Sequence, residues 1–125
     1  MNIVISNNKD APIYEQIYEQ IKNEILQNRI GADESLPSIR NLAKDLKVSV
    51  ITTKRAYTEL ENDGYILTVP GKGSYVANLN ENLINEYYLT ELEKSLKEAI
   101  KLNKYCKLNK DEIISLIETL EKEVE

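Results

Sequence analysis

The 125-residue sequence contains no histidine, a single cysteine and no apolar run of the roughly 18–20 residues that cross a bilayer. The absence of histidine excludes catalytic triads, general bases and metal sites that depend on it. One cysteine, Cys106, excludes an intramolecular disulfide and a zinc site built from several cysteines. Residues 1–6 lack the basic start and long apolar core of a signal peptide. We therefore expect a cytoplasmic protein with no membrane partner, no metal, no cofactor and no catalytic residues.

Charge is distributed unevenly along the chain, whose formal net charge is −5. Residues 1–78 carry 9 basic and 10 acidic side chains, whereas residues 79–125 carry 7 and 11. Within the first part, residues 36–78 carry 6 basic and 4 acidic side chains, a net charge of +2. Because the nearest charges dominate at a Debye length of about 8 Å, this stretch is compatible with binding a polyanion. An ordinary solvated surface is the alternative.

The first expected helix runs from Pro12 to about Asn28. Isoleucine recurs there at every fourth residue, which gives the helix one apolar face, and Pro12 suits a first helical turn. A doubled Tyr-Glu-Gln-Ile over residues 14–21 keeps like residues on one face. Gly31 is expected just after the helix, at the position where a left-handed backbone is common.

Two further helices form a helix-turn-helix pattern. Ser38 is a good N-cap for a helix that ends near Lys47, and Ser49 caps the next helix, which stops before Gly64. A short turn between two helices, with the second basic on its outer face, is typical of this motif. The second helix is expected to bury Thr53, Ala56, Tyr57 and Leu60.

Alternating apolar residues then predict a β-hairpin, with strands at 65–69 and 74–76. Pro70 and Gly71 suit the central positions of a type II turn, and Gly73 permits a second positive φ. Three helices followed by a hairpin is the order of elements in a winged helix-turn-helix domain, in which the hairpin is the wing.

Residues 79–125 are expected to form a helical hairpin. The fold class is therefore mainly α with a small β-hairpin: a winged helix-turn-helix domain over 1–78, followed by a C-terminal helical hairpin. The first tail helix spans about 81–104, and Asn109 with Glu112 forms a capping box for the second. So small a unit needs a partner for its apolar faces, either the winged domain or a second copy of the chain. We expect a homodimer through Leu89, Leu92, Leu96, Ile100, Ile113, Ile117 and Leu120.

The outer face of the helix that follows Ser49 is the strongest candidate for a binding site, because the first two turns of such a helix reach base edges in a major groove. Thr52 and Lys54 offer hydrogen bonds to bases or phosphates, and Ser49 with the helix N-terminus suits a phosphate. Exposed Val50 and Ile51 suit thymine methyl groups. A cap or a solvated surface position is the alternative for each residue alone. The candidate DNA-binding residues are Arg40, Ser49, Val50, Ile51, Thr52, Lys54, Arg55, Gly71 and Lys72.

Three of these candidates lie outside that helix. At the hairpin tip, Gly71 lets the backbone approach a ligand closely, and Lys72 is suited to a minor groove or a phosphate; a plain turn is the alternative. Arg40 lies one turn into its helix, near where the DNA backbone would pass. An ion pair with Asp45 or Glu34 is the alternative for Arg40.

Several segments, in the same order along the chain, resemble the GntR-type bacterial transcription regulators. They are residues 12–17, 36–43, 48–57, 60–66 and 71–76, so that the resemblance covers about residues 11–77. It implies a winged helix-turn-helix domain with a C-terminal dimerisation or effector region. By position, it implies DNA contacts from Arg40, Ser49, Thr52, Lys54 and Gly71.

Two positions depart from the family pattern. Many members carry arginine where this chain has Val50, so a guanine-reading donor is missing and the base preference shifts toward a thymine methyl. Lys54 stands where arginine is frequent. A guanidinium that can donate two parallel hydrogen bonds is thus replaced by an ammonium group, which acts as a point charge. The short tail resembles the YtrA-like subfamily, in which it dimerises the protein; genes of that subfamily often accompany ABC-transporter operons, which they repress.

The sequence thus predicts a homodimeric, sequence-specific DNA-binding transcription regulator that represses an inverted-repeat operator. The YtrA-like resemblance implies that this operator belongs to a transporter operon. Its partner is double-stranded operator DNA, with half-sites roughly 34–36 Å apart or a multiple of that distance. A winged-helix module for protein–protein contact is the main alternative, and an enzyme is disfavoured because no catalytic groups converge. Whether a small-molecule effector binds at the dimer seam is left open.

Overall fold

The computed structural model describes residues 1–7 and 10–124. Their contacts divide the chain into two compact units, Met1–Ile84 and Asn85–Glu125, which we call the winged unit and the tail unit. The winged unit ends beyond the expected domain boundary at residue 78, inside the helix that follows. Within the described residues, no helix combines the length and the apolar character that a membrane crossing requires.

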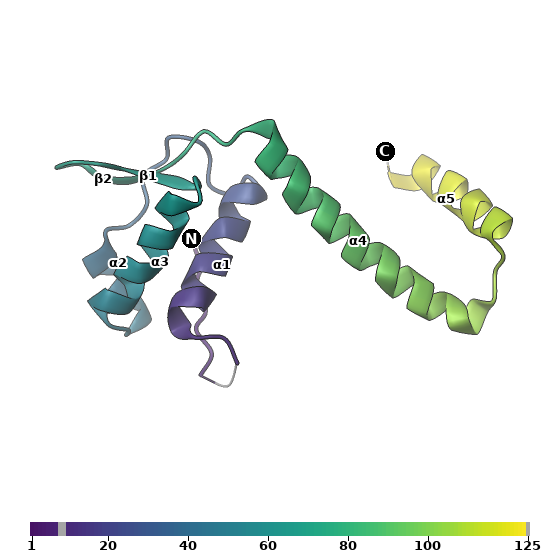
Figure 1. Cartoon of the computed structure of the whole chain (residues 1–125), viewed down its shortest axis with the longest axis horizontal. Coiled ribbons are helices and arrows are strands. Elements are labelled where there is room, and N and C mark those ends of the chain that lie inside the picture. The colour runs from purple at the N-terminus through teal and green to yellow at the C-terminus, as the bar shows by residue number, and fades with distance from the viewer. Residues whose placement is uncertain (8–9, 125) are drawn as a thin grey trace. The chain divides into compact units, whose positions relative to one another are not determined.

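The first helix, α1 (Ile13–Leu26; Figure 1), is amphipathic as predicted. Its four-residue isoleucine spacing puts Ile17 and Ile21 fully inside the core. The predicted role of Gly31 is wrong, because Asn28 takes the left-handed backbone after the helix, with a φ of 57°. Asparagine tolerates this conformation better than most residues, so the helix closes earlier than expected.

The helix-turn-helix consists of α2 (Ile39–Leu46) and α3 (Val50–Asn62). Each starts on its predicted cap, since the hydroxyls of Ser38 and Ser49 accept the backbone N–H three residues on, at 3.1 and 3.0 Å. Helix α3 packs on α1, on α2 and on the hairpin, and it therefore holds the centre of the winged unit. The predicted inner face of α3 is confirmed, because Thr53, Ala56, Tyr57 and Leu60 are all buried.

The wing is an antiparallel hairpin of β1 (Ile66–Val69) and β2 (Gly73–Val76) (Figure 1). Its type II turn is confirmed: Gly71 has a φ of 77°, and the Lys72 N–H donates to the Val69 carbonyl at 2.9 Å. With helices and wing as predicted, and with two helices after them, the expected fold class is confirmed.

An extended segment at residues 34–36, which the sequence pattern did not predict, runs along β2. The Leu36 N–H donates to the Ser74 carbonyl, and the Val76 N–H donates to the Glu34 carbonyl, both at 2.9 Å. The segment therefore pairs with one edge of β2, while β1 pairs with the opposite edge. The segment leads directly into α2, so the wing is tied to the start of the helix-turn-helix.

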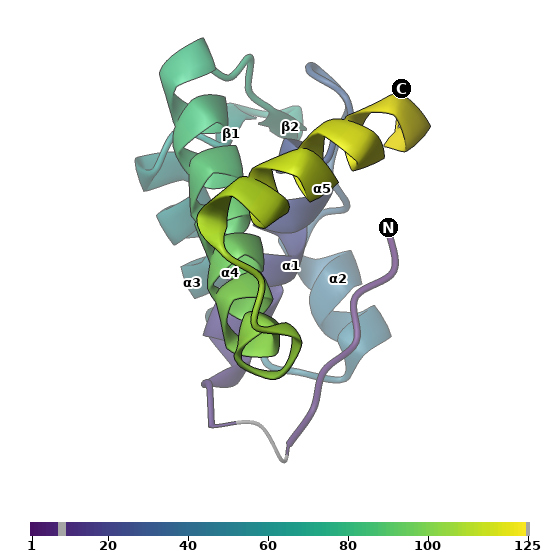
Figure 2. The ribbon, with the colours of Figure 1, turned by 90° about the vertical axis from the view of Figure 1, so that its right-hand side faces the viewer.

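Two glutamines of α1 hold the N-terminal segment. Gln20 accepts from the Val4 N–H at 2.8 Å and donates to its carbonyl at 2.7 Å; Gln16 bonds Ser6 in the same way, at 2.9 and 2.8 Å. The four residues from Gln16 to Gln20 rise about 6.0 Å along the helix, and the two residues from Val4 to Ser6 span about 6.6 Å of extended chain. The two glutamines are therefore spaced to bond both residues. Figure 2 shows this segment, in purple, beside the helices of the winged unit.

The tail unit contains most of α4 (Glu81–Cys106) and all of α5 (Lys110–Val124). The predicted capping box is confirmed: the Glu112 N–H donates to Asn109 Oδ1 at 2.8 Å, and the Asn109 N–H donates to Glu112 Oε1 at 3.1 Å. The Asn103 amide bonds the N–H and the carbonyl of Leu108, which fixes the turn. Yet no described residue of either helix is buried.

Candidate nucleic-acid interface

The first two turns of α3 form an exposed surface opposite its buried face. Val50 is 46% exposed and Ile51 is 81% exposed. Lys54, one turn further on, is also exposed and forms no ion pair with any described residue. The structure therefore brings two apolar side chains and one unpaired cation together at the start of this helix.

Ser49 and Thr52 are bonded to each other in the same turn. The Ser49 hydroxyl donates to Thr52 Oγ1 at 2.7 Å, while it accepts the Thr52 N–H. Ser49 thus anchors the helix start, and Thr52 is only half-buried. Both candidates lie where they were predicted, but the geometry gives their hydroxyls a local partner as well.

Arg55 has a different environment from its neighbour Lys54. Its guanidinium carbon lies 3.7 Å from the centroid of the Tyr14 ring, and its Nε lies 3.6 Å from Glu59 Oε1. The guanidinium face is covered by α1, while the side chain remains 60% exposed. Arg55 therefore links α3 to α1 as well as facing outward.

Tyr14 is a residue whose role the sequence pattern did not predict. The doubled Tyr-Glu-Gln-Ile contained a signal, because three of its four positions have the same kind of role in both copies. Its isoleucines are fully buried, its glutamines hold the N-terminal segment and its tyrosines contact α3 or the segment after it. The period of four therefore fixes three contacts of α1 at once.

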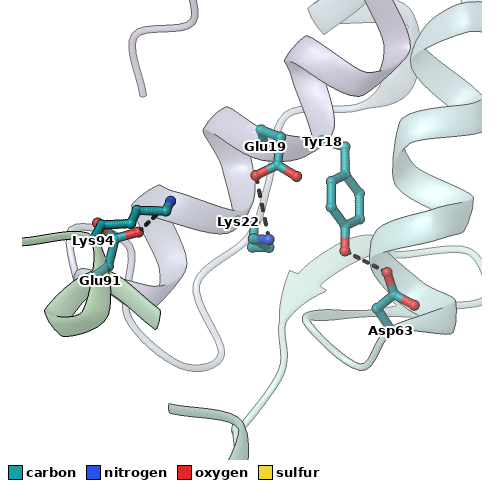
Figure 3. Close-up of polar contacts among 6 residues, drawn as sticks. All are labelled: Tyr18, Glu19, Lys22, Asp63, Glu91 and Lys94. Carbon is teal, nitrogen blue, oxygen red and sulfur yellow. Dashed lines mark hydrogen bonds and ion pairs between the residues drawn. The ribbon is translucent and has the colours of Figure 1, made fainter. Parts of the chain in front are cut away.

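The second tyrosine of the repeat contacts the end of α3. The Tyr18 hydroxyl donates to Asp63 Oδ2 at 2.5 Å (Figure 3), and its ring meets the Tyr65 ring edge-on at 6.4 Å. Lys22, which pairs with Glu19 in the same view, lies 5.5 Å from the Tyr18 ring centroid. Burial, together with the Asp63 carboxylate, raises the pKa of Tyr18 well above its usual range.

Another tyrosine joins the two helices of the helix-turn-helix. The Tyr57 hydroxyl donates to the Pro37 carbonyl at 2.7 Å, just before the cap of α2. Burial raises the pKa of Tyr57 above its usual range, which keeps the hydroxyl protonated as a donor. Helix α3 is thus fixed by polar contacts from α1 and from the start of α2.

The remaining DNA-binding candidates lie on α2 and on the wing. Arg40 is exposed, and among the described residues it pairs with neither Asp45 nor Glu34. Lys72 is exposed at the wing tip beside Gly71. All of the DNA-binding candidates belong to the winged unit, where they lie on α2, on α3 with its cap, and on the wing.

The candidate dimerisation residues lie on α4 and α5 of the tail unit. Ile113 is half-buried, whereas the other six are between 43% and 72% exposed. The side chains predicted to need a partner are thus left uncovered by their own unit. These residues are Leu89, Leu92, Leu96, Ile100, Ile113, Ile117 and Leu120.

Three packed helices, a two-stranded wing and a capped, outward-facing third helix define a winged helix-turn-helix protein. The chain belongs to the gntR family of bacterial regulatory proteins, whose profile matches residues 13–76. Because this is a family of regulators and not of enzymes, the expectation that the chain is not an enzyme is confirmed.

Relatives support the YtrA-like assignment. The transcriptional repressor YtrA of Bacillus subtilis is 35% identical over 98 residues, which cover 78% of this chain and 75% of the relative. The solved structure of YtrA from Sulfolobus acidocaldarius is 32% identical, with a TM-score of 0.59 over 73% of this chain and 97% of that one. The DNA-binding domain of AraR, in complex with operator ORX1, is 28% identical, with a TM-score of 0.55 over 62% and 96%.

Proposed function

We propose that the chain is a sequence-specific DNA-binding transcription repressor. The observation that carries the proposal is the outer face of α3, where a capped helix start presents Lys54, free of ion pairs among the described residues, beside exposed Val50 and Ile51. The relatives support it, because YtrA is a repressor and the similar AraR domain is bound to an operator.

In this proposal α3 enters a major groove, and α2 and the wing contact the flanking backbone. Lys54 bonds a guanine or a phosphate, Arg40 a phosphate, and Lys72 a phosphate or the minor groove. Arg55 contributes the exposed edge of a guanidinium whose face is held by Tyr14. The proposed contact set is Arg40, Ser49, Val50, Ile51, Thr52, Lys54, Arg55, Gly71 and Lys72.

We also propose that the chain acts as a homodimer through its tail unit. The support is that α4 and α5 have no buried described residue while they present a series of leucines and isoleucines. Removing such side chains from water contributes about 25 cal/mol per Å². A symmetric dimer requires a symmetric site, so the operator is an inverted repeat with half-sites roughly 34–36 Å apart or a multiple of that.

The proposed biological setting follows from the YtrA-like resemblance: a cytoplasmic repressor of a transporter operon. Sequencing the genomic fragments that the purified chain retains will test this setting. Enrichment upstream of transporter genes is expected. Enrichment at unrelated promoters would contradict the setting and leave DNA binding intact.

Selection of bound duplexes from a random pool tests the DNA-binding proposal. The expected result is enrichment of one inverted repeat. A winged-helix module that binds proteins instead of DNA would enrich no sequence. The enriched duplex should also bind less tightly as salt is raised, with a log–log slope of about −0.9 for each phosphate contact.

A further inference from the structure

Few hydrogen-bonding groups on the first two turns of α3 are unpaired in the structure. The hydroxyls of Ser49 and Thr52 are bonded to each other, and the Arg55 guanidinium is stacked on Tyr14 and paired with Glu59. Lys54 alone combines exposure, a charge and freedom from ion pairs with the described residues. Lys54 is therefore the group of this surface that is least committed to partners within the chain.

Two apolar side chains occupy the rest of this surface. Val50 is the first residue of α3 and Ile51 the second, and they are 46% and 81% exposed. Neither packs into the core that Thr53 and Ala56 enter from the opposite side of the helix. An exposed β-branched pair at a helix start adds nothing to helix stability, since both residues have modest helix propensity. The exposed Val50 and Ile51 side chains are suited to contact with an apolar group of a ligand.

The major groove of DNA offers one apolar group, the 5-methyl of thymine. We propose that Val50 and Ile51 read thymine 5-methyl groups, so that each operator half-site carries thymine opposite the start of α3. This inference rests on the proposed function, and it adds the base that the site recognises. Lys54, one turn further on, supplies the accompanying charge for a phosphate or a guanine.

Deoxyuridine provides a test that leaves the protein unchanged, because it differs from thymidine only by the 5-methyl group. The probe is the duplex that the full chain selects from a random pool, with each thymidine replaced in turn by deoxyuridine. Burying one methyl group corresponds to about a three- to fivefold change in affinity. We expect a loss of that size at one or two thymidines in each half-site and none elsewhere, measured by fluorescence anisotropy.

Variants of the chain then assign the methyl contacts. In the double variant Val50→Ala, Ile51→Ala, the selected duplex and its deoxyuridine forms should bind equally well, because the partner of the methyl is gone. In the matched variant Lys54→Ala, overall affinity falls but the deoxyuridine penalty stays. Both substitutions are at exposed positions, so each variant is expected to fold.

Three results would overturn the inference. If no deoxyuridine substitution changes the affinity for the selected duplex, the methyl contact is contradicted while DNA binding is unaffected. A penalty that persists in the Val50→Ala, Ile51→Ala variant assigns the methyl to another residue. If the pool yields no selected duplex, the proposed function fails, and this inference fails with it.

Discussion

At the residue scale, the neighbouring cations Lys54 and Arg55 show how packing assigns different roles to similar side chains. Lys54 extends from α3 with no ion pair among the described residues, whereas Arg55 lies 3.7 Å from the Tyr14 ring centroid and pairs with Glu59. Lys54 is therefore available to a phosphate or a base in the proposed complex. Arg55 already stabilises the position of α3 against α1 before DNA binds.

Replacing the unpaired cation tests its direct contact with DNA. We expect Lys54→Ala to weaken binding to the selected duplex by about 1–3 kcal/mol, because a charge-assisted bond to a base or phosphate is lost. Gel-shift titration measures the change. Lys101→Ala removes the same charge from an exposed site on α4 and should leave affinity nearly unchanged. Equal affinity of the Lys54→Ala variant and the unmodified chain would remove Lys54 from the contact set.

The Tyr14 contact predicts a loss of stability that depends on the aromatic ring. Tyr14→Leu keeps apolar volume but removes the ring under Arg55, so the free energy of unfolding should fall by about 0.5–1 kcal/mol. Tyr14→Phe keeps the ring and should change it little. Urea unfolding measures both variants; if they are equally stable, the stacking contributes nothing.

The Tyr18–Asp63 contact predicts a loss of stability in alkali. Because folding raises the pKa of Tyr18, the unfolded chain loses this proton first, near pH 10. The stabilising contribution is therefore complete below pH 10 and is lost as the pH rises further. The urea midpoint of the unmodified chain should therefore fall between pH 10 and 12, and in Tyr18→Phe this fall should be smaller. Asp63→Asn removes the charge but keeps an acceptor, so it should reduce the fall by less than Tyr18→Phe does. Identical pH profiles would contradict this assignment.

At the scale of elements, the sequence predicted what depends on local patterns. The caps Ser38, Ser49 and Asn109 follow from short-range chemistry, and the structure confirms each of them. Pairing of residues 34–36 with β2 was not predictable, because a polar connection gives no strand period. The repeat marks Tyr14, but the identity of its partner Arg55 was not predictable from local patterns, since the two residues lie on different helices 41 positions apart.

The wing turn gives a prediction at this scale. Gly71 has a φ of 77° with open space around it, so Gly71→Ala adds backbone strain without a clash. We expect the free energy of unfolding to fall by about 1–2 kcal/mol. Gly31→Ala is the matched control, because Gly31 has no positive φ and its added Cβ would make only an ordinary contact, 3.5 Å from Glu34. Equal effects of the two substitutions in urea unfolding would contradict the type II turn as the cause.

At the scale of the whole molecule, the net charge is unevenly distributed along the chain. Of the net charge of −5, the last 47 residues carry −4, while residues 36–78 carry +2. The acidic total disfavours loose association with DNA, which depends on summed positive charge. In the proposed function, specific binding therefore depends on a small basic face, which the proposed dimer presents twice.

Charge placed on the apolar face of α4 tests the dimer. Leu92→Glu combined with Leu96→Glu buries two carboxylates at the proposed seam, so we expect sedimentation to show monomers. Operator affinity should then fall by about 100-fold or more, since the second half-site is no longer held nearby. Lys101→Glu, also on α4, is the control and should stay dimeric. An intact dimer in the double variant would contradict the assigned seam.

The measurement that tests the central claim most directly compares the affinity of the full chain for its selected duplex and for a scrambled duplex across a salt series. We expect both affinities to fall steeply with salt, and the selected duplex to bind at least about 10³-fold more tightly at physiological salt. Equal affinity for the two duplexes, or affinity that does not depend on salt, would contradict sequence-specific binding through the outer face of α3.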